Sequence, residues 1–376
     1  MTPPKTARLG SLDILRGFDL FVLVFFQPVF MALARRLEWA WLEPIMWQFS
    51  HVPWEGFTFW DLIMPLFMFM AGAAMPFAFR KYLANGGKTQ LYQRIFKRVI
   101  LLWILGMIAQ GNLLGLDPSS IRLYSNTLQA IAMGYLISAV LLMHCTIRWQ
   151  LVVTASFLFI YWALLTFVQI NGFGGGNFTP DYNLAEYVDR EILGRFRDRA
   201  RITEEGLAFG NYRYTWILSS LNFGATVMSG VFAGHIMKSG MAKTRIIMWL
   251  ALTGVLLVAA GLLLSLHMPI IKRIWTSSMT LYSSGWCFLL MALFYYLVDY
   301  RDFGKYLNWL KIYGMNSILA YMLFQVVNFG SISRSLLHGT EQYLGEYYGV
   351  LLGFSNAMIV FFMLLALYRQ RKFLKV

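Results

Sequence analysis

The sequence predicts an all-α polytopic membrane protein, a bundle of about ten transmembrane helices with a re-entrant or interfacial segment after the first. Of its 376 residues, 58% are hydrophobic and only 13% are charged, and the mean hydropathy is +0.56, whereas soluble domains are roughly 25% charged. Apolar runs long enough to cross a hydrocarbon core of roughly 30 Å recur along the chain. Lys and Arg are also unevenly distributed between the two expected sides. We therefore expect one transmembrane domain over residues 1–376.

Hydropathy gives the order of the expected spans. The leader before the first span has no small-residue cleavage site, so we expect this span to be retained as a helix. Tryptophans at positions 39, 41, 47 and 54 follow it, a composition typical of the membrane interface. The ten spans are expected at about residues 13–34, 59–80, 96–115, 124–145, 149–170, 214–238, 245–265, 275–298, 306–328 and 345–368.

The basic residues predict the orientation of the chain. An even number of spans returns the C-terminus to the side of the N-terminus, and this side then holds 20 of the 32 Lys and Arg residues. Basic residues concentrate in cytoplasmic loops. Both termini are therefore expected in the cytoplasm, in a multi-pass protein of the cytoplasmic (inner) membrane, with His51 on the opposite side. The net charge of +14 follows largely from this sidedness and does not require a nucleic-acid partner.

A polar excursion, residues 171–213, follows the fifth expected span on the extracytoplasmic side. Its run DREILGRFRDRARITEE mixes acidic and basic residues closely. Such alternation predicts a surface helix with many ion pairs. A lid over a binding site is the alternative interpretation.

The segment from His51 to Arg80 combines polar groups with a membrane span. His51 precedes Asp61 by ten residues, Gly56 lies between them, and residues 62–79 carry no charge. A histidine accepts a proton near neutral pH, and a carboxylate at hydrogen-bond distance fixes its tautomer and favours the imidazolium. The sequence predicts such a pair if the loop folds back onto the second span.

Other polar residues allow two interpretations each. Arg16 lies within helical reach of Asp13 and Asp19, which predicts either a surface ion pair or a site for an anion. Polar groups in 124–145 either pack helices or line a cavity, and hydroxyls in 275–298 either bond to helix carbonyls or serve a ligand. Small residues in 214–238 predict close helix packing. Cys145 and Cys287 have no ligand spacing and indicate neither a disulfide nor a metal site.

Several motifs resemble a known family when taken together. They are RLGSLDILRG near the start, HVPWEGFTFWDLIMPLFMFMAG from His51, IIKRIWTSSMTLYSSGWCFLL and YGMNSILAY. In this order they resemble the transmembrane acetyltransferases related to heparan-α-glucosaminide N-acetyltransferase, and more closely the bacterial NagX-like branch. The resemblance implies an enzyme that transfers acetyl from cytosolic acetyl-CoA to a glucosamine-type amine across the membrane. It also implies a homodimer and no metal.

The resemblance assigns roles to particular positions. The family's catalytic histidine corresponds to His51 and its acidic partner to Asp61. Gln27 replaces an asparagine of the animal members, and Gln129 lies in Thr127-Leu128-Gln129-Ala130, where those members have a V-L-Q-R-like motif. Gln27, Gln129, Ser278 and Asn316 are the expected substrate-binding or oxyanion residues. The expected acetyl-CoA-binding residues are Arg16, Arg94, Arg98, Trp275 and Thr276.

Two mechanisms are open for such an enzyme. His51 acts as a general base with both substrates bound, or it attacks first and carries the acetyl group as acetyl-imidazole. Direct transfer is favoured because acetyl-imidazole is sensitive to water. From another functional class, a transporter or channel for a small sugar or metabolite is the alternative, because polar residues at mid-depth also describe a permeation path. The chain has no convincing internal repeat and few charges within its spans.

Overall fold

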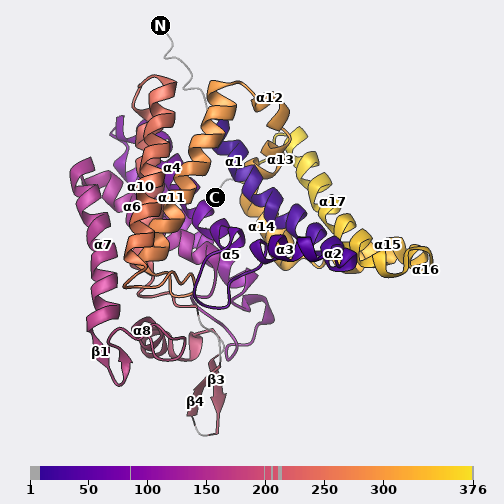
Figure 1. Cartoon of the computed structure of the whole chain (residues 1–376), viewed down its shortest axis with the longest axis horizontal. Helices are drawn as coiled ribbons and strands as arrows, with labels where there is room; N and C mark the ends of the chain where they lie inside the picture. The colour runs from indigo at the N-terminus through magenta and orange to yellow at the C-terminus, as the bar shows by residue number, and fades with distance from the viewer. Residues whose placement is uncertain (1–8, 85, 199, 205, 211–213, 375–376) are drawn as a thin grey trace. The chain divides into compact units, whose positions relative to one another are not determined.

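The computed structural model describes residues 9–84, 86–198, 200–204, 206–210 and 214–374 (Figure 1). Of these described residues, 74% are helical. Two short antiparallel hairpins are the strands of the described chain: β1 (Gln169–Ile170) pairs with β2 (Phe173–Gly174), and β3 (Ala200–Thr203) pairs with β4 (Gly206–Phe209). The structure thus confirms the predicted all-α polytopic class.

Seven helical stretches of the described residues are long and apolar enough to cross a membrane. They are Gly10–Leu37, Phe59–Arg80, Thr127–His144, Ile147–Phe167, Lys243–Leu264, Ser277–Tyr300 and Phe329–Arg369. Three of the ten expected spans do not meet this criterion. Helix α5 (Lys88–Ala109) begins with several basic residues, and α9 (Ser220–Lys238) is rich in small and polar residues. The expected span 306–328 is broken into α12 (Gly304–Leu307), α13 (Leu310–Met315) and α14 (Ser317–Val326).

The described chain divides into two compact units, which we describe separately. The first comprises residues 9–46, 240–251 and 289–374. In it α1 (Gly10–Phe21) continues through a π-helical turn into α2 (Gln27–Leu37), and α1 packs against α13. A Cβ built on Gly314 would lie 2.1 Å from the carbonyl oxygen of Asp13, so this crossing requires glycine. Helix α17 (Tyr348–Arg369) packs against α2, α13 and α15 (Phe329–Leu337).

A short helical segment joins the first stretch to the loop that holds His51. It consists of a 3₁₀ turn at Ala40–Leu42 and α3 (Glu43–Gln48). Trp39, Trp41 and Trp47 expose half or more of their surface. Exposed aromatic rings on a short helix fit the predicted interfacial segment.

The second unit comprises residues 47–239 and 252–288. Its centre is α9, against which α4 (Ile63–Ala84), α6 (Thr127–His144) and α7 (Ile147–Phe167) pack. A Cβ on Gly72 or on Gly230 would lie 1.9 Å from a backbone oxygen of the facing helix. The predicted small-residue packing of this span is therefore confirmed, and it fixes α4, which follows directly on the 3₁₀ turn that holds Asp61.

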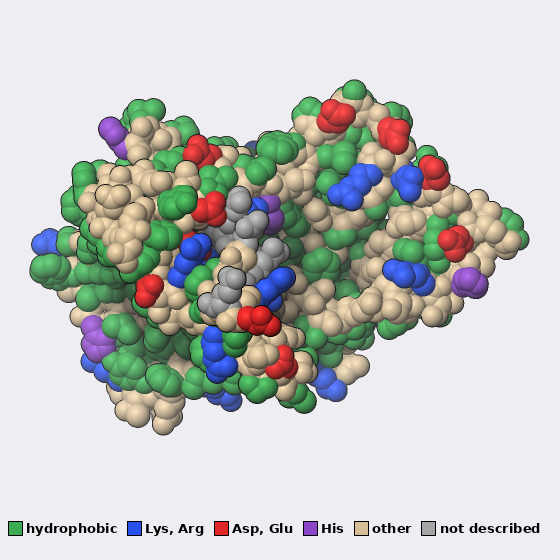
Figure 2. All heavy atoms as spheres, turned by 90° about the horizontal axis from the view of Figure 1, so that it is seen from below, with side chains coloured by type: hydrophobic (Ala, Val, Ile, Leu, Met, Phe, Trp, Pro, Cys, Tyr) green, Lys and Arg blue, Asp and Glu red, His purple; other side chains and the backbone are tan. Residues whose placement is uncertain are grey.

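Part of the excursion packs against α7 within the second unit. Helix α8 (Leu184–Leu193) packs with α7 and with the loop after α10 (Lys243–Leu264) through a buried apolar cluster that includes Leu184, Tyr161 and Ile271. Figure 2 shows acidic and basic side chains interspersed on the face that carries α8, β3 and β4. The predicted ion pairs are present, but α8 is half-buried rather than a surface helix, because Glu186 and Asp189 on it are both buried.

Candidate active site

The loop from Phe49 to Thr58 positions His51. Gly56 has a φ of +116°, which only glycine adopts without strain, and its N–H donates a hydrogen bond to the carbonyl of Ile270 (2.9 Å). Thr58 and Asp61 form a capping box at the 3₁₀ turn Phe59–Leu62, which leads into α4. These local features turn the chain so that His51 faces Asp61.

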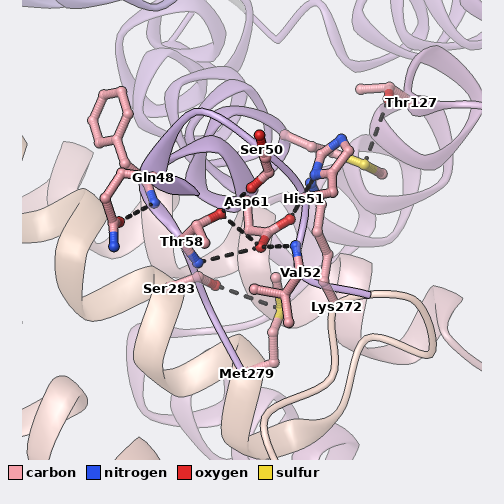
Figure 3. A network of polar contacts seen from close by, with 12 residues as sticks. Gln48, Ser50, His51, Val52, Thr58, Asp61, Thr127, Lys272, Met279 and Ser283 are labelled. Carbon is pink, nitrogen blue, oxygen red and sulfur yellow. Dashed lines mark hydrogen bonds and ion pairs between the residues drawn. The ribbon is translucent and has the colours of Figure 1, made fainter. Parts of the chain in front are cut away.

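Three side chains, from the His51 loop, the 3₁₀ turn after it and the α10–α11 loop, meet at this place (Figure 3). His51 Nδ1 lies 2.7 Å from Asp61 Oδ1, which confirms the expected contact. Lys272 Nζ lies 3.2 Å from the same carboxylate oxygen and 3.4 Å from His51 Nδ1. We call these residues the His51–Asp61–Lys272 cluster. Asp61 Oδ2 accepts hydrogen bonds from the N–H and hydroxyl of Thr58 and from the N–H of Val52.

The members of the cluster differ in exposure. The side chains of Asp61 and Lys272 are 3% and 8% exposed, and that of His51 is 42% exposed. Burial lowers the pKa of His51; the hydrogen bond to Asp61 opposes this shift and the charge of Lys272 adds to it. Burial also lowers the pKa of Lys272, against the attraction of Asp61. The imidazole is therefore partly exposed, it is held by a buried ion pair, and its lowered pKa favours the uncharged ring that can accept a proton.

The loop with Lys272 connects α10 to α11 (Ser277–Tyr295) and is held by three residues predicted for other roles. The hydroxyls of Thr276 and Ser278 donate to the carbonyl of Pro269 at 2.9 and 3.0 Å. Trp275 adopts a left-handed φ of +50°, and its indole N–H donates to Thr226 (3.1 Å). These contacts fix the loop, so the expected oxyanion and acetyl-CoA roles of these residues stay predictions.

The remaining predicted residues of the second unit lie outside the cluster. Gln129 is buried, and its amide accepts from the N–H of Ser125 and donates to the carbonyl of Leu123. Arg94 donates to the hydroxyl of Tyr82, and Arg98 lies over the ring of Tyr135, 4.3 Å from its centroid. Gln129 thus closes the turn before α6, and the two arginines are in cation–π contacts on α5.

Arg16, Gln27 and Asn316 belong to the first unit. Arg16 lies on α1 and Gln27 begins α2. Asn316 separates α13 from α14; its amide nitrogen donates to the carbonyl of Lys372, and its oxygen accepts from the N–H of Leu374. Asn316 therefore ties the C-terminal segment to the first unit. Asp19 is fully buried and neither carboxylate oxygen has a hydrogen-bond partner among the described residues, so the expected pairing with Arg16 is wrong for this acid.

Lys272 is the residue that the sequence did not predict. It stands with Arg273 in a short loop between two apolar spans, on the side expected to be poor in basic residues. Basic residues on the side where the positive-inside rule expects few are a signal that could have identified Lys272.

Among the described residues, no group of three His, Cys, Asp or Glu side chains could hold a metal ion. Cys145 and Cys287 form no disulfide.

Comparison with known proteins gives consistent matches. Residues 8–180 match the model of a domain of unknown function, DUF5009. The chain is 26% identical to human heparan-alpha-glucosaminide N-acetyltransferase over 365 residues, which cover 84% of this chain and 52% of the relative. The mouse protein of the same name is 25% identical over 367 residues, covering 85% of this chain and 54% of its own length. The chain is therefore similar to these acetyltransferases over most of its own length.

The predicted resemblance is thus confirmed, and the closer likeness to the bacterial branch stays a prediction. The alignment includes most of this chain, yet the chain spans about half the length of the curated relatives it matches.

Proposed function

We propose that the protein is a membrane-bound N-acetyltransferase that moves an acetyl group from acetyl-CoA to the amine of an amino sugar. The relationship to proteins named as N-acetyltransferases supports the reaction class. The single observation that carries the proposal is the contact of His51, 42% exposed, with the buried carboxylate of Asp61. This arrangement is that of a general base with an orienting acid.

Acetyl transfer to an amine needs a group that accepts a proton as the carbon–nitrogen bond forms. With Nδ1–H donated to Asp61, the Nε2 lone pair of His51 is available to the amine. The amine nitrogen attacks the thioester carbonyl carbon, and its proton passes to Nε2. The carbon–sulfur bond then breaks, and the imidazolium returns the proton to the departing CoA sulfur. Asp61 stabilises the imidazolium while it exists.

We favour direct transfer over an acetyl-imidazole intermediate. The imidazole is open to water on one side, and an acetyl-imidazole there would hydrolyse in competition with transfer. A stoichiometric burst of free CoA from acetyl-CoA in the absence of an acceptor would show the two-step route instead.

The sidedness and the binding residues complete the proposal. The Lys and Arg distribution supports cytoplasmic termini and entry of acetyl-CoA from the cytoplasm, with the acceptor on the opposite side of the inner membrane. Arg94 and Arg98 on α5, with Arg16 on α1, are proposed for the CoA phosphates. Gln27 and Asn316 are proposed for the substrate or the oxyanion. Homodimerisation is proposed from the resemblance alone.

The test uses the full chain in lipid nanodiscs with acetyl-CoA and glucosamine, and mass spectrometry of the acetylated product. We expect His51→Ala to reduce the rate by about 10²- to 10⁴-fold. His267→Ala, an exposed histidine on the same α10–α11 connection as Lys272, is the matched control and should keep the parental rate. Acetyl-CoA at saturating concentration should raise the melting temperature of both variants.

Three outcomes would contradict the proposal. Acetylation by His51→Ala at the parental rate would remove the role of His51. Absence of acetylation by the parental protein for any amino sugar, with no stabilisation by acetyl-CoA, would remove the enzyme. Sugar uptake into proteoliposomes in that case would favour the transporter alternative.

A further inference from the structure

Lys272 is the least expected member of the His51–Asp61–Lys272 cluster. Its side chain is 8% exposed, and its ammonium lies 3.2 Å from Asp61 Oδ1. A buried ammonium is costly unless it is paired and hydrogen-bonded. The pairing with Asp61 satisfies that requirement, and it places a cation 3.4 Å from the ring nitrogen of His51. A cation so close to a proposed base affects that base directly.

We propose that Lys272 is a positioning residue for His51: its ammonium shares Asp61 Oδ1 with the imidazole, fixes the Nδ1–H tautomer and keeps the ring uncharged at neutral pH. This inference rests on the proposed function for its consequence in catalysis. The arrangement of the three side chains does not depend on the proposed function.

Hydrogen-bond geometry supports the tautomer. Asp61 Oδ1 has two neighbours, His51 Nδ1 at 2.7 Å and Lys272 Nζ at 3.2 Å. If Nδ1 carried no proton, its lone pair would face a carboxylate oxygen at 2.7 Å, which is repulsive. With Nδ1–H, both neighbours donate to Oδ1 while Thr58 and Val52 occupy Oδ2. The Nε2 lone pair then remains for a substrate.

Charge supports the uncharged ring. A carboxylate alone beside His51 would favour the imidazolium, and a cation at similar distance offsets that attraction. Two cations face the ring from the α10–α11 loop, Lys272 and Arg273, and one acid faces it from the 3₁₀ turn, Asp61. Tyr214, whose ring lies 5.8 Å from the Arg273 guanidinium, is uncharged at neutral pH. The balance of these groups depends most on Lys272, since it is the closest cation.

The experiment measures His51 directly and does not depend on acetyl transfer. The nanodisc-embedded full chain is treated with diethyl pyrocarbonate, which modifies uncharged imidazole, and modification of the His51 peptide is followed by mass spectrometry from pH 5 to 9. The midpoint for His51 is compared with that of exposed His267 in the same sample. For the parental protein we expect a midpoint below the ordinary value of about 6.5.

The substitution Lys272→Gln separates charge from hydrogen bonding, because the amide still donates to Asp61 but carries no charge. We expect the His51 midpoint to rise by about one pH unit. Lys272→Arg keeps the charge and should stay near the parental midpoint. An unchanged midpoint in Lys272→Gln, with His267 also unchanged, would overturn the proposal and leave Lys272 as a structural brace. If Lys272→Gln does not fold, Lys272→Met, with similar buried volume, still tests the loss of the charge, although it also removes the hydrogen bond to Asp61.

A second measurement connects the inference to the reaction. The ratio of parental to Lys272→Gln acetylation rates is taken at pH 7 and at pH 8.5, so that ionisation of the acceptor amine cancels. We expect the ratio to fall by up to about threefold at the higher pH, because the variant's imidazole loses its proton there. A ratio independent of pH would overturn the electrostatic role, whereas failure of the parental enzyme to acetylate would count against the proposed function only.

Discussion

Two buried ionic clusters of the second unit invite comparison. In the His51–Asp61–Lys272 cluster the acid is buried but the histidine is 42% exposed. In the excursion, Glu186 bonds Arg190 through Oε1 (2.7 Å) and Arg197 through Oε2, and the side chains of Glu186 and Arg197 are each 1% exposed. In the first cluster the imidazole of His51 is partly exposed to solvent. In the second cluster the acid Glu186 and its partner Arg197 are both buried.

This difference separates a site that can react from one that stabilises. In the excursion, the Glu186 carboxylate accepts from two arginines, and Asn183 caps α8 by accepting a hydrogen bond from the Glu186 N–H at its Oδ1 (2.8 Å). Nearby, Asp189 accepts from the N–H groups of Trp216 and Ile217, and burial raises its pKa to about 7. Such groups hold segments together. A reactive group, in contrast, needs an accessible atom that rigid neighbouring residues hold in place.

The largest expected effect is that of Asp61→Asn on acetyl transfer. The amide would turn its oxygen toward the Thr58 and Val52 donors and its NH₂ toward His51, which selects the wrong tautomer and leaves Lys272 unpaired. We expect a loss of about 10²- to 10⁴-fold in rate. The matched control is Asp181→Asn, an exposed acid of the excursion. A loss below about threefold for Asp61→Asn would remove the distinction between the two clusters.

Glu186→Gln tests the other cluster through stability. It leaves the Arg197 guanidinium buried without its acid, which costs about 3–5 kcal/mol when a buried pair is broken. We expect a lower melting temperature and faster tryptic cleavage of the excursion. Glu191→Gln, an exposed position on the same helix, should change stability by less than about 0.5 kcal/mol. Equal behaviour of the two variants would show that this ion pair contributes nothing.

Much of the fold could be predicted because membrane spans are specified by composition. Apolar length predicted the helices, and the small residues of α9 predicted close helix packing, which its contact with α4 shows. The break at Asn316, with φ −121° and ψ 41°, could not be predicted, because hydropathy does not register a local dihedral change. The half-burial of α8 was missed for a similar reason: alternating charges do not reveal which ion pairs face inward.

The candidate site was predictable only where its signals are local. His51 and Asp61 are ten residues apart, and the Gly56 turn and the Thr58–Asp61 capping box lie between or beside them. Lys272 follows Asp61 by 211 residues, and its place depends on the hydrogen bond between Gly56 and Ile270. No local pattern specifies such a long-range contact.

Trp54→Phe has the smallest expected effect. It tests how far the His51 loop and the excursion depend on each other. Trp54 lies in the His51 loop, and its indole N–H donates to the carbonyl of Phe178 in the excursion (2.9 Å). Phenylalanine keeps an aromatic ring against the buried cluster and removes the donor, so we expect a loss of about 0.5–1.5 kcal/mol in stability.

The acetylation rate of Trp54→Phe should stay within about twofold of the parental rate, because Gly56 and the Thr58–Asp61 capping box hold the His51 loop independently. Trp39→Phe, whose ring is 50% exposed, is the matched control for removing an indole N–H. Melting temperature and rate are measured on the same nanodisc samples. A large loss of rate without a loss of stability would mean that the excursion acts on the site as a lid, since only the link between the two regions would have changed.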